Sequence, residues 1–101
     1  MLFEYTIKQA RIDFPQKFFP YKLISEDQRN TILSHYDDVY MSNIQANGAK
    51  EALEKLFAIF NIDHPSDFKG HSLSVSDIIL LKYNGQEELW FCEPIDWIRI
   101  Q

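Results

Sequence analysis

The sequence has one cysteine, three scattered glycines and no apolar stretch long enough to span a bilayer, which requires roughly 18 consecutive residues. A single cysteine excludes an internal disulfide and is typical of a reducing compartment. Scattered glycines exclude the glycine-rich loop that binds phosphate in nucleotide-binding proteins. The first residues lack the basic and apolar segments of a signal peptide, so we expect a cytoplasmic protein.

Basic residues are scarce in the second half of the chain. Residues 51–101 contain nine Asp or Glu and four Lys or Arg, whereas residues 1–50 contain six of each kind. The five net negative charges of the second half would repel phosphates, so direct nucleic-acid binding is not expected. These charges could attract a basic surface on a protein partner, or they could serve only to keep the protein in solution.

Apolar residues are abundant at 46% and aromatic residues at 15% of a 101-residue chain, which suits a single folded domain over residues 1–101. Residues 10–24 contain two prolines and have no regular apolar period. We expect irregular chain there, with aromatic side chains that either join the core or form an exposed binding surface. These aromatic residues are Phe14, Phe18, Phe19 and Tyr21.

Alternating or short apolar runs predict several β-strands. The first strand should bury Phe3, Tyr5 and Ile7 on one face. The third should be buried on both faces, and Asn84-Gly85 after it is typical of a two-residue hairpin turn. The strand-like segments are residues 2–9, 36–44, 77–83, 88–93 and 96–101.

Two segments have helical patterns. A short helix over residues 26–34 should begin at Ser25 with a capping box and bury Ile32 and Leu33. The main helix covers residues 49–60, and its apolar positions follow the spacing of one helix face. These positions are Ala49, Ala52, Leu53, Leu56, Phe57 and Phe60. We therefore predict an α+β fold in which a small antiparallel sheet of four to five strands packs against the main helix, with the short helix beside it.

Turn-forming and polar residues gather between the main helix and the strand at 77–83. Pro65 prevents the helix from continuing, and Gly70 allows a close approach of the backbone. Ser and Asp side chains readily bond nearby backbone groups. We expect an ordered corner that uses these side chains as braces and leaves none of them for a reaction. The residues concerned are Ser72, Ser74, Ser76 and Asp77.

The same corner contains residue types found in catalytic centres. His71 with Ser74 or Ser76 would supply a base and a nucleophile, and Asp77 an acidic group. Such an enzyme would require these side chains to converge with free functional groups in a concave pocket. A nucleophilic centre needs a nucleophile, a base and a group that orients the base. The serine and His71 supply only the first two, which is too little to predict a hydrolase, so we predict no enzymatic activity and no cofactor.

Metal and thiol chemistry have weak signals. His64, Asp67 and His71 lie within eight residues and could share a metal ion, but hydrogen bonding within the loop is the better explanation of the two histidines. Cys92 lies in the middle of a predicted strand, where a buried and unreactive thiol is expected. We therefore predict no metal site.

The segment Pro-Ser-Asp-Phe-Lys-Gly-His-Ser-Leu-Ser-Val-Ser-Asp at residues 65–77 resembles the signature of the YodL-like domain family. The resemblance extends over roughly residues 3–100 and includes Tyr-Asp-Asp-Val-Tyr at 36–40. Near the end, residues 91–93 and 96–97 differ from the Tyr-x-Asp and Gly-Phe that are usual in the family. The shared signature positions are Pro65, Asp67, Phe68, Gly70, Ser72, Leu73, Ser74, Val75, Ser76 and Asp77.

The resemblance implies a context, since such domains occur in proteins of phages and conjugative elements, often beside antirestriction modules, with no established activity. We therefore expect a mobile-element protein in the bacterial cytoplasm that inhibits a host nuclease defence, of the anti-CRISPR or antirestriction type, by covering a basic surface. The acids expected to contact the partner are Glu87, Glu88, Glu93 and Asp96. The alternative is an accessory or structural domain of the element's replication or transfer machinery.

Overall fold

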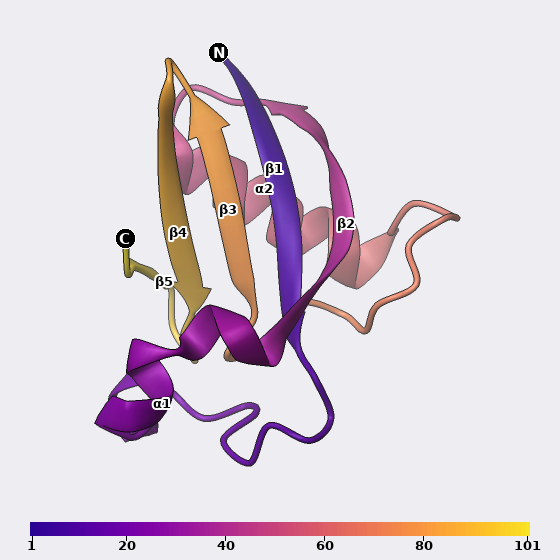
Figure 1. The fold of residues 1–101 in the computed structure, drawn as a ribbon. Coiled ribbons are helices and arrows are strands. Elements are labelled where there is room, and N and C mark those ends of the chain that lie inside the picture. Colours follow the sequence, from indigo (N-terminus) through magenta and orange to yellow (C-terminus); the bar gives the residue numbers. More distant parts are fainter.

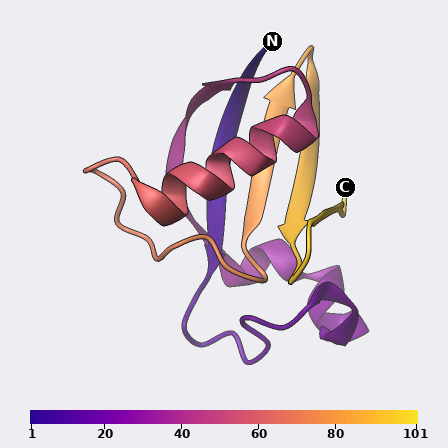
Figure 2. The same cartoon turned by 180° about the vertical axis from the view of Figure 1, so that it is seen from behind.

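The computed structural model covers residues 1–101 and contains one five-stranded antiparallel sheet with the strand order β2-β1-β3-β4-β5. Helix α2 crosses one face of the sheet, and residues 11–35 cover the lower part of the other face (Figures 1 and 2). The predicted α+β class is confirmed. The elements are β1 (Leu2–Ala10), α1 (Glu26–Asn30), β2 (Tyr36–Gln45), α2 (Ala49–Ile62), β3 (Ile78–Tyr83), β4 (Gln86–Cys92) and β5 (Trp97–Arg99).

The central strand β3 is buried on both faces because its side chains alternate between two hydrophobic cores. Ile79 and Leu81 belong to the core beneath α2. Ile78 and Leu80 pack in the second core, with residues that precede β2. The prediction for this strand is confirmed. The hairpin prediction is also confirmed, since β3 and β4 are joined at Asn84-Gly85, where both residues have the positive φ of a type I′ turn (51° and 75°).

Helix α2 begins after Gly48 and continues two residues beyond the predicted end. The carboxylate of Glu51 accepts a hydrogen bond from the backbone N–H of Asn47 at 2.6 Å and lies 3.8 Å from the ammonium group of Lys55. Both contacts stabilise the first turns, where free N–H groups favour an acidic side chain. None of the helices has the length and apolar character needed to cross a membrane.

The buried face of α2 is narrower than predicted. Its fully buried side chains are Ala52, Leu53, Leu56 and Phe60. Phe57 is 41% exposed, so its assignment to the core was wrong. Successive helical residues turn by about 100°, which places Phe57 at the flank of the apolar stripe centred near Leu56. There its ring meets only the edge of Trp97, with ring centroids 6.5 Å apart.

The short helix predicted over residues 26–34 is divided in two. Helix α1 ends at Asn30, and a separate 3₁₀ turn covers Ile32–His35. Ser25 caps α1 as expected, because its hydroxyl oxygen accepts a hydrogen bond from the N–H of Gln28 at 3.4 Å. The break changes the direction of the side chains that follow, so Ile32 is buried whereas Leu33 is partly exposed, contrary to prediction.

The aromatic residues before α1 differ in burial. Phe14 is buried in the second core, where it stacks on His35 at 4.7 Å between ring centroids. Phe18 and Phe19 are about half exposed. Only part of this segment therefore stabilises the fold.

We expect the substitution Leu56→Ala to lower the free energy of unfolding by about 2–5 kcal/mol, because it removes buried methyl groups and leaves a cavity. Phe57→Ala should cost clearly less, because its side chain already contacts solvent. Chemical denaturation of the two variants measures the difference. An equal or larger loss for Phe57→Ala would contradict the exposed position of this ring.

Candidate functional site

The corner that joins α2 to β3, residues 64–77, depends on a close approach at Gly70. A Cβ atom at this position would lie 2.3 Å from the side-chain oxygen of Gln9 and 2.9 Å from the ring of Phe68. Both distances are shorter than any tolerated contact, so only glycine fits without displacing Gln9 or Phe68. Glycine is therefore required here for space.

The first part of the corner is anchored to α2 and β2. The ring of Phe68 is buried and meets Phe60 and Tyr40 at centroid distances of 4.8 and 6.0 Å. The carboxylate of Asp67 accepts a hydrogen bond from the hydroxyl group of Tyr40 at 3.0 Å. The N–H of Phe68 donates to the carbonyl of Pro65 at 3.0 Å, which closes a turn. These contacts give the Pro-x-Asp-Phe part of the signature a structural role.

The serines and Asp77 hold the second part of the corner. The Oδ2 atom of Asp77 accepts hydrogen bonds from the N–H of Ser74 at 2.8 Å and from the amide of Gln9 at 3.1 Å. The hydroxyl of Ser74 donates to the carbonyl of Ser72 at 2.9 Å. Ser76 is fully buried, and its hydroxyl oxygen accepts from the N–H of Phe18 at 2.9 Å. The corner is thus tied both to itself and to the chain that precedes α1.

One oxygen of this network is left without a hydrogen bond. Asp77 is 1% exposed, and its Oδ1 atom lies 3.8 Å from the Nε2 atom of His71; neither atom has a hydrogen-bond partner. The Nδ1 atom of His71 lies 2.7 Å from the carbonyl of Ser72, to which it must donate. In a neutral imidazole the Nε2 atom is then an acceptor, so two acceptors face each other unless one of them carries a proton.

Burial favours a proton on the carboxyl group of Asp77. Desolvation raises the pKa of Asp77 from 3.8 to about 7, although the hydrogen bonds from Ser74 and Gln9 and the charge of Lys17 oppose the shift. A protonated Asp77 can donate toward His71 while its other oxygen keeps the two hydrogen bonds. The expectation that every polar atom of the corner braces the chain therefore fails at Oδ1 of Asp77.

The corner does not assemble a nucleophilic centre. Since Nε2 of His71 has no hydrogen-bond partner, neither Ser74 nor Ser76 forms the hydroxyl–imidazole bond that activates a serine. Cys92, the one thiol, is buried, and desolvation raises its pKa to about 12, which keeps it protonated.

The residues considered for a metal site are not brought together. His64 lies against the ring of Phe68, Asp67 accepts from Tyr40, and His71 faces Asp77. The structure contains no group of three or more His, Cys, Asp or Glu side chains arranged to hold an ion.

The acids expected to contact a partner are in different environments, and two of them lie in the β3–β4 hairpin. Glu87 is exposed but pairs with Lys82 at 3.2 Å. Glu88 is only 6% exposed, and its carboxylate accepts hydrogen bonds from the hydroxyl of Tyr83 and the indole N–H of Trp90 at 2.7 and 3.0 Å. Glu88 shares the sheet face of its cross-strand partner Leu81, which explains the burial. Its carboxylate does not belong to an exposed acidic surface.

The other two acids flank the turn between β4 and β5. Asp96 pairs with Lys50 at 2.9 Å, and this hydrogen bond lowers the pKa of its carboxyl group. Glu93 has no cationic partner; its carboxylate accepts a long hydrogen bond, 3.4 Å, from the N–H of Tyr21. Of the four predicted acids, Glu93 therefore keeps an uncompensated charge near the surface.

A groove lies between α2 and the β4–β5 turn, and we call it the turn groove. Its lining residues are Glu54, Phe57, Cys92, Glu93, Pro94, Ile95, Asp96 and Trp97. Trp97 is buried at its base, whereas Ile95 in the turn is 88% exposed. Glu54 and Glu93 form no ion pair, so the groove combines apolar surface with two uncompensated acids. The sequence analysis identified Glu93 and Asp96 but missed Glu54 and Ile95, whose proximity arises only in the folded chain.

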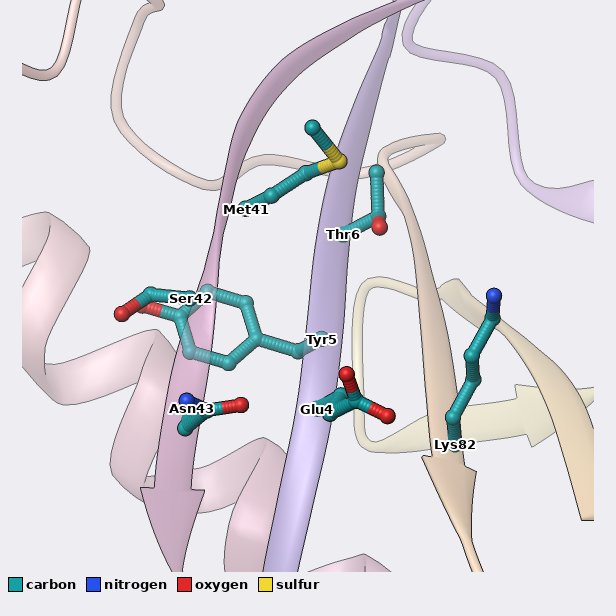
Figure 3. A pocket seen from close by; sticks show the side chains of 7 residues that line it. All are labelled: Glu4, Tyr5, Thr6, Met41, Ser42, Asn43 and Lys82. Atoms are coloured by element: carbon teal, nitrogen blue, oxygen red, sulfur yellow. The ribbon is translucent and has the colours of Figure 1, made fainter. Parts of the chain in front are cut away.

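A second hollow lies on the face opposite α2, on the part of the sheet that residues 11–35 leave uncovered. It is lined by Glu4, Tyr5, Thr6, Met41, Ser42, Asn43 and Lys82 (Figure 3). Glu4 and Lys82 are direct neighbours on β1 and β3, and the ammonium group of Lys82 also pairs with Glu87. The hollow therefore contains a cation beside its acid, whereas the turn groove is lined by acids and no cation.

Comparison with known proteins gives a family and no characterised relative. Residues 4–101 match the family model of the YodL-like domain. No curated protein and no solved structure matches the chain. The match includes all strands and helices except the first two residues of β1.

We expect the stability of the protein to fall as the pH rises from about 4 to 7, by about 1.4 kcal/mol per pH unit at most, because the folded state keeps a proton on Asp77 that the unfolded state releases. Above pH 7 this contribution is constant. The substitution Asp77→Asn supplies a permanent donor toward His71 and keeps an acceptor for Ser74 and Gln9. It should remove this slope, as measured by denaturation at several pH values. A variant with an unchanged slope would contradict the assignment.

Proposed function

The chain belongs to the YodL-like domain family, and from this premise and the chemistry of its surface we propose that it is a non-enzymatic module that binds a protein partner through the turn groove. The observation that carries the proposal is the exposed pair of Phe57 and Ile95 beside two acids without ion pairs. Protein interfaces combine apolar anchors, which lose water on binding, with a polar rim that selects the partner.

The charges of the groove favour a basic partner. Glu54 and Glu93 form no ion pair within the chain, so a Lys or Arg from a partner could pair with them. The carboxylates of Glu87, Glu88 and Asp96 already pair with Lys82, Arg99 and Lys50, at 3.2, 3.4 and 2.9 Å. A partner would have to break these pairs, so they contribute less. The partner we propose presents an apolar side chain flanked by cationic residues.

The family context extends the proposal to a biological role, the inhibition of a host defence nuclease of the anti-CRISPR or antirestriction type. Surfaces that bind DNA are rich in Lys and Arg, because they neutralise phosphates. An acidic and apolar groove complements such a surface and would exclude DNA from it. If the partner is instead a protein of the element's own replication or transfer machinery, the same groove acts as an accessory docking site.

We expect the double substitution Glu54→Lys and Glu93→Lys to weaken partner binding by about tenfold or more, since it replaces two attractive contacts by repulsive ones. The readout is the survival of unmodified plasmid or phage DNA in cells that carry a defined restriction or CRISPR system, with and without the protein. The matched control is Glu4→Lys with Glu26→Lys, which changes the net charge equally but lies outside the groove.

Protection of DNA by the native chain and by the control, but not by the groove variant, supports the proposal. Equal protection by all three would exclude the turn groove as the binding site. If the native chain protects against no system tested but binds a purified element-encoded protein in a groove-dependent manner, the inhibitor role fails and the accessory role replaces it.

A further inference from the structure

Strand β2 forms one edge of the sheet and is ten residues long, whereas β5 at the opposite edge has three. β2 pairs only with β1, and none of the backbone hydrogen bonds outside the regular elements reaches residues 37–45. The N–H and C=O groups on its outer side are therefore free to pair with another strand.

The register of β1 and β2 identifies the residues whose backbone groups face outward. The N–H of Ala46 donates to the carbonyl of Met1 at 3.0 Å, which continues the pairing of Leu2 with Gln45. In an antiparallel pair, alternate residues point their backbone groups toward the neighbouring strand. Even-numbered residues from Ile44 back to Tyr40 therefore face β1. Met41, Asn43 and Gln45 present their N–H and C=O groups outward.

This outward row lacks the usual protection of a strand edge. Residues 40–45 contain no charged residue and no proline. The register shift opposite Ile7 and Lys8 lies at Val39, so it leaves residues 40–45 regular. Only the carbonyl of Gln45 is occupied, by the ammonium group of Lys55 at 3.0 Å. The charges and the bulge of this strand are confined to its first part, at Asp37, Asp38 and Val39, so residues 40–45 stay open to pairing.

An apolar and charged flank lies beside this edge. The C-terminal end of α2 and the loop after it extend past β2 on the helix side of the sheet, and we call this part the overhang (Figures 1 and 2). Ile62 at this end is 84% exposed, and Ile59, one turn after Lys55, is partly exposed on the same flank. Asp63 and Asp67 in the overhang form no ion pair. Lys55 of the flank is half exposed, and its only acidic neighbour is Glu51 at 3.8 Å.

We propose that two copies of the chain associate through β2 about a two-fold axis, with Asn43 opposite Asn43 of the second copy. Met41 then lies opposite Gln45, so each outward N–H meets an outward C=O. The carbonyl of Gln45 can accept from Met41 while it keeps Lys55, because it has two lone pairs. An axis perpendicular to the sheet keeps both α2 helices on the same side. The overhang of each copy then covers the Lys55 and Ile59 flank of the other.

Charge and apolar surface both favour a second copy over an unrelated strand. The overhang contains Asp63 and Asp67 against one cation, Lys69, so it keeps a net negative charge. The pairing places this charge toward Lys55 of the other copy, and the symmetry repeats this contact. It also covers Ile62, which is otherwise almost fully exposed. A strand from an unrelated protein would occupy the edge but would bring neither the acidic overhang nor the matching flank. The turn groove lies on the opposite side of α2 and remains free in this dimer.

Sedimentation or light scattering from about 1 µM to about 1 mM should show a dimer for the native chain, within the range of ordinary dissociation constants. The substitution Asn43→Pro removes an outward N–H without removing a bond to β1. It should raise the dissociation constant at least about tenfold, because symmetry removes two hydrogen bonds. Circular dichroism and thermal unfolding verify that the variant folds.

A second pair of variants tests the overhang independently of the strand. Ile62→Ser should weaken the dimer, whereas Ile12→Ser, at a residue that is also almost fully exposed but lies in the segment after β1, should not. Amide exchange at Met41, Asn43 and Gln45 should slow as the concentration rises. A native chain that stays monomeric at the highest concentration overturns the proposal. A dimer unaffected by Asn43→Pro, or amides that exchange equally fast at all concentrations, would assign association to another surface and overturn it as well.

Discussion

The side chain of Gln9, at the end of β1, binds three groups of the corner between α2 and β3. Its amide donates to the carbonyl of His71 at 2.8 Å and to Asp77 at 3.1 Å, and its oxygen accepts from the N–H of His71 at 3.2 Å. These bonds satisfy a buried amide and fix the loop where it enters the central strand. Gly70 leaves the space that Gln9 needs, so the glycine and the glutamine depend on each other.

The same network explains why a carboxyl group is tolerated in the interior. Asp77 lies at the start of β3, and its backbone carbonyl accepts from the N–H of Cys92 at 2.8 Å. Tyr36, at the start of β2, reaches the corner through a hydrogen bond of 2.6 Å from its hydroxyl to the carbonyl of Ser76. Burial of the carboxyl group costs free energy that a proton recovers. As a consequence, the stability of the protein depends on pH.

Periodicity and turn chemistry predicted most of the fold from the sequence. Asn84-Gly85, the alternation in β1 and the apolar face of α2 depend on neighbours in the chain, and the structure confirms them. Phe57, Leu33 and Glu88 were placed wrongly because their exposure depends on the position of other elements. Nothing in the sequence indicated that Gln9 is buried and binds the corner, since a glutamine in a strand is usually solvent-exposed and its partners are about 60 residues away.

The turn groove lies outside the polar atoms of the family signature. The side chains of Ser74 and Ser76 form hydrogen bonds inside the molecule, so they stabilise the corner and have little left to offer a partner. Residues 92, 93, 96 and 97, in contrast, line the turn groove, and they depart from the ending that the family resemblance leads us to expect. Because the interior stabilises the fold, the residues at the border of the groove can change without unfolding the protein. Partner choice should therefore vary with the residues around the β4–β5 turn while the signature stays the same.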